Sequence, residues 1–112
     1  MLIHAIDDLR LSPRAAKFEG AKHGDGIAVS SFITQYERGG GPDQHLHPYA
    51  ELFIVQQGVA EFRVDGRSVE VAAGNVVVVP PNTPHGFKNP GDEELRVVSV
   101  HPSAEVAQTD LE

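Results

Sequence analysis

The sequence contains no cysteine among its 112 residues. Disulfide bonds and thiolate ligands are therefore excluded, and any metal ion would have to be held by nitrogen and oxygen donors. Basic residues are scarce as well, with nine Lys and Arg against 16 Asp and Glu and a formal net charge of −7. Because nucleic-acid backbones are bound through clustered positive charge, these scattered basic residues argue against a nucleic-acid partner.

Long hydrophobic runs are also missing. No stretch approaches the roughly 18 apolar residues of a membrane-spanning helix. The first residues, Met1 to Asp8, have neither the basic region nor the uninterrupted apolar region of a secretion signal. We therefore expect no membrane partner and a cytoplasmic location. The length suits one compact domain, and we expect a single domain over residues 1–112.

The chain does contain many turn-forming residues, with eleven glycines and eight prolines. They separate short β-branched runs, and no helical period is visible, so the pattern predicts an all-β sandwich or barrel of eight to ten strands. Residues 1–14 are interpreted as an edge strand and a turn, 76–79 as a buried core strand, and 103–112 as a flexible tail. The expected strands are Ala15–Glu19, Ile27–Glu37, Glu51–Gln57, Val59–Val64, Arg67–Val71, Val76–Val79, His85–Lys88 and Leu95–His101. A loop is expected at residues 20–26, and Asp65-Gly66 is expected to form a two-residue hairpin turn, since both residues tolerate positive φ.

Three histidines and one glutamate carry the most specific chemical information. His45, His47 and Glu51 share the same parity, so one extended segment can direct all three side chains to the same interior. His85 follows Pro84 and is expected to approach from another strand across the barrel. Three imidazoles and a carboxylate form an N3O set that suits one divalent transition metal, with Fe, Mn, Ni, Co, Cu and Zn as candidates.

Glycines, prolines and an asparagine frame these four residues in two motifs. The first spans residues 39–58 and is written Gly39-x5-His45-x-His47-x3-Glu51-x6-Gly58. The second spans residues 74–89 and is written Gly74-x5-Pro80-x-Asn82-x2-His85-x3-Asn89.

The two motifs resemble those of the cupin superfamily, and in particular its small single-domain members. The resemblance implies a double-stranded β-helix, or jelly-roll, barrel in which His45, His47, Glu51 and His85 bind one metal ion. The sequence departs from the family pattern at Asn82, where glycine is usual. Asparagine tolerates the left-handed backbone conformation better than most residues, so we expect the turn to be retained.

The resemblance leaves the reaction open, because the family includes dioxygenases, isomerases, decarboxylases, cyclases and non-enzymatic binders. Our first hypothesis is a metal-dependent enzyme on a small organic substrate, with dioxygenase chemistry favoured over isomerase or cyclase chemistry. The alternative is a non-catalytic module that binds or senses a small molecule. No catalytic residue beyond the metal ligands can be named, and a homodimer is expected because an edge strand at residues 1–10 would be covered.

The remaining histidines and aromatic residues receive structural interpretations. His4, His23 and His101 are expected at the surface or at an edge of the barrel. Tyr36, Tyr49 and Gln35 are expected to pack or to form hydrogen bonds beside the motifs. The barrel core is expected to contain Phe53, Phe62 and Phe87.

Overall fold

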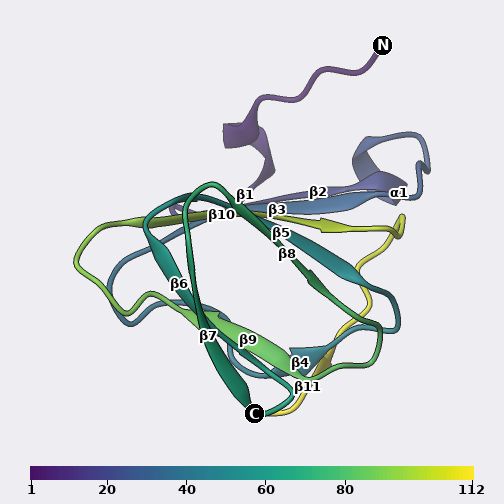
Figure 1. The fold of residues 1–112 in the computed structure, drawn as a ribbon. Helices are drawn as coiled ribbons and strands as arrows, with labels where there is room; N and C mark the ends of the chain where they lie inside the picture. The colour runs from purple at the N-terminus through teal and green to yellow at the C-terminus, as the bar shows by residue number, and fades with distance from the viewer.

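The computed structural model describes residues 1–112 and contains two antiparallel β-sheets that face each other (Figure 1). The six-stranded sheet has the order β1 (Arg10–Ser12), β2 (Ala15–Glu19), β3 (Ser30–Tyr36), β10 (Leu95–His101), β5 (Glu51–Gln57) and β8 (Asn75–Val79). The five-stranded sheet has the order β11 (Thr109–Asp110), β4 (His45–Leu46), β9 (His85–Lys88), β6 (Val59–Val64) and β7 (Arg67–Ala72). The prediction of an all-β protein is confirmed.

Inward-facing side chains of both sheets form the core. Along β5 and β10, alternate residues are buried, as expected for strands with one covered face. Phe53 of the six-stranded sheet packs edge-to-face against Phe62 and Phe87 of the other, with ring centroids 5.2 and 5.7 Å apart. The expected placement of these three phenylalanines in the barrel core is confirmed.

The predicted turns follow the expected backbone chemistry. Asp65 and Gly66 have φ angles of 50° and 79° and connect β6 to β7 in register, with Val64 opposite Arg67. Asn82, where the sequence departs from the family pattern, has a φ of 56° and so adopts the left-handed conformation.

Two short helical turns were not predicted. A 3-10 turn, η1 (Ile6–Leu9), precedes β1 where an edge strand was expected, and one turn of α-helix, α1 (Gly20–His23), lies in the predicted 20–26 loop. Gly20, the first residue of α1, lets the backbone of Ile27 approach closely, because a Cβ at this position would lie 1.9 Å from the carbonyl oxygen of Ile27. Single turns of this kind are too short to leave a periodic signal in the sequence. No helix of the structure has both the length and the hydropathy needed to cross a membrane.

The interpretation of residues 76–79 as a buried strand is wrong for half of its side chains. Val79 is buried, but Val76 and Val78 are 58% and 62% exposed. The reason is topological, since β8 is the last strand of the six-stranded sheet and its outer face has no covering layer. A continuous apolar run indicates burial on both faces only when a second layer is present.

The C-terminal segment, expected to be a flexible tail, pairs with the five-stranded sheet through two residues. Thr109 and Asp110 of β11 pair with Leu46 and His45 of β4, and the backbone N–H of Leu111 donates to the carbonyl of Gln44. The segment therefore covers the edge of the five-stranded sheet beside the motif histidines (Figure 1).

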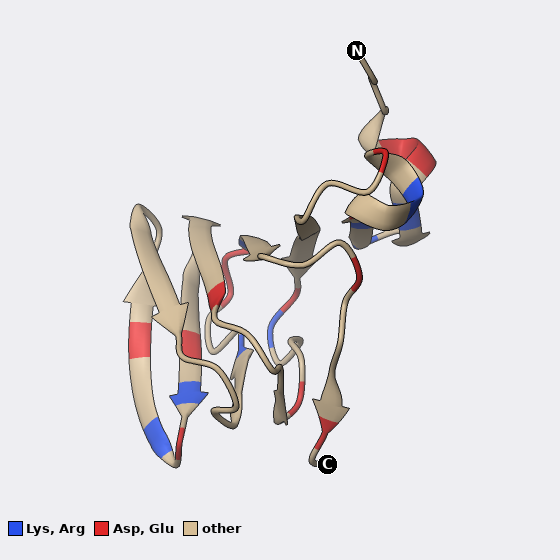
Figure 2. Cartoon of the chain, turned by 90° about the vertical axis from the view of Figure 1, so that its right-hand side faces the viewer, with Lys and Arg blue, Asp and Glu red and all other residues tan.

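Charged residues are distributed over both sheets and the connecting loops (Figure 2). Several basic side chains contact acidic ones, including Lys88 with Asp43 at 2.7 Å and Arg38 with Asp92 at 2.8 Å. These pairs are exposed and each contributes little stability.

Gly58 and Gly74, the last glycine of the first motif and the first of the second, offer a matched test of the fold. Both have positive φ, 80° and 92°, but a Cβ at Gly58 would lie 2.7 Å from the carbonyl oxygen of Glu94, while Gly74 has open space. Gly74→Ala should cost about 1–2 kcal/mol of unfolding free energy for the left-handed backbone. Gly58→Ala should cost a further 1–3 kcal/mol, roughly, for the backbone overlap. Urea denaturation measures both values, and equal losses would contradict this account.

Candidate metal centre

The four predicted ligands converge at one point between the two sheets. His45, His47, Glu51 and His85 are all buried, and one donor atom from each lies within 4.8 Å of the others. His45 of β4 is directly opposite His85 of β9 in the five-stranded sheet, while Glu51 is the first residue of β5 in the six-stranded sheet. The sequence thus identified residues that the fold brings together.

The route by which they converge differs from the prediction. A single extended segment does not present the first three, because β4 ends at Leu46 and the chain crosses to the other sheet before Glu51. The segment 47–50 contains Pro48 and forms no strand, so strand parity does not apply across it. His85 is likewise a neighbour of His45 in the same sheet, and Glu51 is the ligand that approaches from the opposite one.

Each of the three imidazoles is held by a backbone carbonyl at Nδ1. The partners are the carbonyl oxygens of Asp43 for His45 at 2.6 Å, Ala107 for His47 at 2.7 Å and Thr83 for His85 at 2.8 Å. Because a carbonyl can only accept, each Nδ1 must donate its proton, which leaves the lone pair of a neutral ring on Nε2. Imidazoles oriented in this way are typical of metal-ligating histidines.

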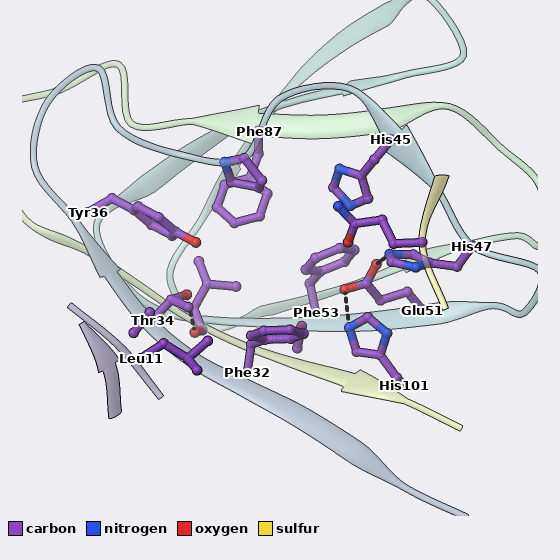
Figure 3. A pocket seen from close by; sticks show the side chains of 15 residues that line it. Leu11, Phe32, Thr34, Tyr36, His45, His47, Glu51, Phe53, Phe87 and His101 are labelled. Carbon is purple, nitrogen blue, oxygen red and sulfur yellow. Dashed lines mark hydrogen bonds and ion pairs between the residues drawn. The ribbon is translucent and has the colours of Figure 1, made fainter. Parts of the chain in front are cut away.

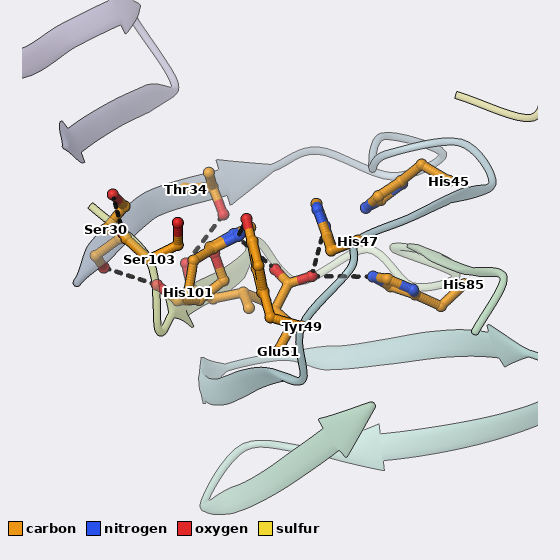
Figure 4. Close-up of polar contacts among 12 residues, drawn as sticks. Ser30, Thr34, His45, His47, Tyr49, Glu51, His85, His101 and Ser103 are labelled. Atoms are coloured by element: carbon orange, nitrogen blue, oxygen red, sulfur yellow. Dashed lines mark hydrogen bonds and ion pairs between the residues drawn. The ribbon is translucent and has the colours of Figure 1, made fainter. Parts of the chain in front are cut away.

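The atoms that face one another inside the group are electron-pair donors, which a bound cation would hold together. Glu51 Oε1 lies 2.9 Å from Nε2 of His47 and 2.9 Å from Nε2 of His85 (Figure 4). His47 Nε2 is fully buried and, although close to Glu51, has no hydrogen bond of acceptable geometry. Two nitrogen lone pairs and a carboxylate oxygen at such distances repel one another unless protons or a metal ion lie between them.

The donor chemistry of the four residues fits a divalent transition metal. Three imidazole nitrogens and one carboxylate oxygen suit borderline ions such as Fe, Mn, Co, Ni, Cu and Zn. The cofactor prediction is confirmed in this sense: buried His45, His47, Glu51 and His85 form a metal-binding group.

The electrostatic environment keeps the carboxylate ionised. Burial alone would raise the pKa of Glu51, but contacts with the imidazoles of His101, His47 and His85 outweigh it and hold that pKa far below its ordinary value. Burial lowers the pKa of His45. Burial would also lower the pKa of His47, but the contact with Glu51 and the hydrogen bond to the carbonyl of Ala107 outweigh burial. The pKa of His47 is therefore raised.

A fifth residue of the site, His101, was assigned to the surface or an edge, and this prediction is wrong. His101 ends β10, is 1% exposed, and places Nε2 3.0 Å from Glu51 Oε2. Its Nδ1 lies 2.7 Å from the hydroxyl of Tyr49, which also accepts from the N–H of Ala107. Since the carboxylate can only accept, the proton of a neutral His101 ring belongs on Nε2, and Nδ1 then accepts from the hydroxyl of Tyr49. Like Nε2 of His47, Nε2 of His101 is fully buried and lies close to Glu51 without the alignment of a hydrogen bond.

The alternation of inward and outward residues along β10 could have identified His101 as an inward-facing residue. Leu95, Val97 and Ser99 are the inward residues of β10, and His101 continues the same alternation. By contrast, His4 is exposed and His23 half-buried, away from the group, where His4 Nε2 lies 2.7 Å from the carbonyl of His23.

A cavity of about 240 Å³ adjoins the metal-binding group (Figure 3). Its lining includes His45, His47, Glu51 and His101 together with Tyr36, Phe53 and Phe87. Tyr49 stacks on His47 with ring centroids 5.3 Å apart and packs behind the site, as expected for a structural tyrosine.

The comparison with known families agrees with this geometry. The model of the cupin domain matches residues 32–101, well over half of the chain. The protein is a cupin.

Two relatives from Streptomyces share part of the cupin sequence. Over 56 residues, 49% of this chain, it is 39% identical to the polyketide synthase CurC of Streptomyces cyaneus, and the match covers 36% of that protein. Over the same length it is 36% identical to the protein SchB of Streptomyces halstedii, covering 41% of it. The chain thus matches less than half the length of these curated relatives.

Solved structures confirm the jelly-roll cupin barrel. A variant of Bacillus subtilis oxalate decarboxylase superposes with a TM-score of 0.84 over 96% of this chain and 31% of that chain, at 23% identity. Oxalate decarboxylase of Lactobacillus farciminis gives a TM-score of 0.80 over 94% of this chain and 34% of that chain, at 24% identity. At these identities the likeness establishes the fold.

The contact of His101 with Glu51 generates a prediction about metal affinity. Replacing His101 by Leu removes the imidazole that contacts Glu51 Oε2 and should weaken metal binding about 10- to 100-fold. His101→Gln, whose amide can donate to the same oxygen, should lose less. Competition with a fluorescent chelator measures affinity, and circular dichroism verifies folding. His4→Leu, at an exposed histidine, is the control, and equal affinities in all three variants would refute the role of His101.

Proposed function

We propose that this cupin is a metal-dependent enzyme that acts on a small organic substrate, with dioxygenase chemistry favoured over isomerase or cyclase chemistry. The observation that carries the proposal is the position of the metal-binding group at the wall of a cavity. A group held only for stability would be closed on all sides, whereas this one has room beside it for a ligand.

The number of protein ligands supports a reactive site. Four ligands on a six-coordinate ion leave two positions for water, dioxygen or two oxygen atoms of a substrate. The ion, when bound, would supply Lewis acidity or a template for a substrate beside dioxygen. The protein holds the three imidazoles by their Nδ1 atoms, so their Nε2 atoms need no reorientation when a ligand enters.

The surrounding side chains would exclude water from such a reaction. Phe32, Phe53 and Phe87 line the cavity next to the histidines and the glutamate. The local match to the polyketide synthase CurC supports a small organic substrate.

Metal content gives the first test. Protein purified without an affinity tag should contain close to one equivalent of a transition metal, or take it up on reconstitution with Fe(II) or Mn(II). His47→Ala should lower metal affinity strongly, by roughly 100-fold or more, because it removes one of four ligands from a site of fixed geometry. His4→Ala should leave it unchanged. Absence of metal in the wild-type protein, before and after reconstitution, would overturn the proposal.

Turnover needs a separate measurement. Metal-loaded protein is mixed under anaerobic conditions with candidate diols and enols, and oxygen uptake is recorded when air is admitted. Consumption of oxygen that His47→Ala abolishes supports a dioxygenase. Product formation without oxygen uptake indicates an isomerase or cyclase, and tight ligand binding without any product indicates a binding module.

We also propose that the protein forms a homodimer through the outer face of the six-stranded sheet. Ile54, Val76 and Val78 are 36%, 58% and 62% exposed on this face. They lie in register with further apolar residues of β5 and β10: Leu52, Val98 and Val100. The N-terminal residues lead away from the barrel next to this sheet, and Leu2 and Ile3 are exposed (Figure 1). A contiguous apolar face of this kind is typical of an interface with a second chain.

A charge on this face should separate the dimer. Val78→Glu places an unpaired carboxylate at the centre of the proposed interface and should give a monomer, whereas the wild-type protein should have the mass of a dimer. Leu111→Glu is the matched control, since Leu111 is 47% exposed but follows β11 in the other sheet. Size-exclusion chromatography with light scattering measures the mass. A wild-type monomer would disprove the dimer.

A further inference from the structure

The cavity beside the metal-binding group has two chemically different ends (Figure 3). His45, His47, Glu51 and His101 form one end. Tyr36, Thr34 and Leu11 lie at the other end, with the phenylalanine rings between the two. A bound molecule that reaches from one end to the other therefore meets metal ligands at one side and mostly apolar surface at the other.

The lining contains no lysine or arginine, and Glu51 is its only carboxylate. Both oxygens of Glu51 are already engaged, Oε1 with the imidazoles of His47 and His85 and Oε2 with His101. With a divalent ion bound, the ion and the Glu51 carboxylate together carry one net positive charge. A dicarboxylate bound there would leave one negative charge that no cationic side chain of the lining offsets. The charge of the cavity therefore disfavours dianions.

Aromatic rings of Phe32, Tyr36, Phe53 and Phe87 contribute to the lining. Phe87 packs edge-to-face against Phe53 and Tyr36, with ring centroids 5.7 and 5.5 Å apart. Such a set accommodates a further planar ring in stacked or edge-to-face contact. Burial raises the pKa of Tyr36, so its phenol stays neutral and can donate a hydrogen bond to a polar group of the ligand.

The size of the cavity limits the ligand. A volume of about 240 Å³ lies below the roughly 300–1,000 Å³ of pockets for drug-sized molecules. A ligand of one or two fused rings fits a volume of this size.

We propose that the substrate is a planar ring that carries two neighbouring oxygen atoms, such as a hydroxyl beside a carbonyl, and that it binds with no more than one negative charge. The oxygen pair would face the metal-binding group and the ring would lie among Tyr36, Phe53 and Phe87. This inference rests on the proposed function, because the oxygen pair is useful only if the group holds a metal. It separates this protein from enzymes of small dicarboxylates, whose barrels share its fold.

The test compares two chelating probes on protein loaded with Co(II), whose visible spectrum changes when its ligands change. Maltol carries a hydroxyl beside a carbonyl on a planar ring and chelates as a monoanion after it releases the hydroxyl proton to solvent. Oxalate chelates through two oxygens as well, but as a dianion. Each dissociation constant is divided by that of the probe for aqueous Co(II), so that intrinsic chelating strength cancels. We expect the normalised affinity for maltol to exceed that for oxalate by about tenfold or more, the effect of unpaired charge burial.

A matched pair of variants tests the aromatic end. Tyr36→Leu should weaken maltol binding about three- to tenfold through loss of the ring contact and leave oxalate binding unchanged. Phe18→Leu makes a similar change outside the cavity and should alter neither. Folding is verified by circular dichroism and by Co(II) stoichiometry.

The outcomes separate this inference from the proposed function. Failure to bind Co(II) overturns both. Co(II) binding with an equal or greater normalised affinity for oxalate overturns the inference and leaves the metal site standing. A preference for maltol that Tyr36→Leu does not reduce refutes the role of the aromatic end.

Discussion

The negative charge of one buried carboxylate governs the interior of this barrel. Glu51 is 4% exposed and has imidazoles on both of its oxygens, two at Oε1 and one at Oε2. An isolated carboxylate at such a depth would cost far more free energy than a small domain can spare, so its partners are a condition of folding as well as of metal binding. The two sheets meet at this charge, because Glu51 belongs to one and His85 to the other.

The sequence predicted which residues form the metal-binding group, but not the path of the chain that brings them together. His45, His47, Glu51 and His85 could be found because donor type, spacing and framing glycines leave few alternatives. The crossing of the chain between the sheets at residues 47–50 could not be found, since parity holds only within one strand. His101 shares no motif with the four ligands, and its burial depends on pairing between β10 and β5, which are far apart in sequence.

Features of the fold that depend on local sequence, such as turns, could be predicted. Features that depend on how the two sheets cover each other could not. Turn residues placed most of the strands correctly, and Asp65 and Gly66 adopted the expected hairpin turn. The error at Val76 and Val78 has a different origin, because a run of valines carries the same β-propensity in a covered strand as in an edge strand. Which face lacks a covering layer is a property of the whole topology, and in this protein it leaves an apolar surface that a second chain can cover.

The C-terminal segment shows that the site extends beyond the residues that the cupin domain model matches. The cupin domain model ends at residue 101, yet the carbonyl of Ala107 holds the ring of His47 and the N–H of Ala107 holds the hydroxyl of Tyr49. Gln108 lines the same cavity. A segment that pairs through only two residues of β11 has little stability of its own, so its position depends on β4. Orientation of one metal ligand is therefore coupled to the closure of the barrel edge, and a ligand or metal that fixes His47 would in turn stabilise this segment.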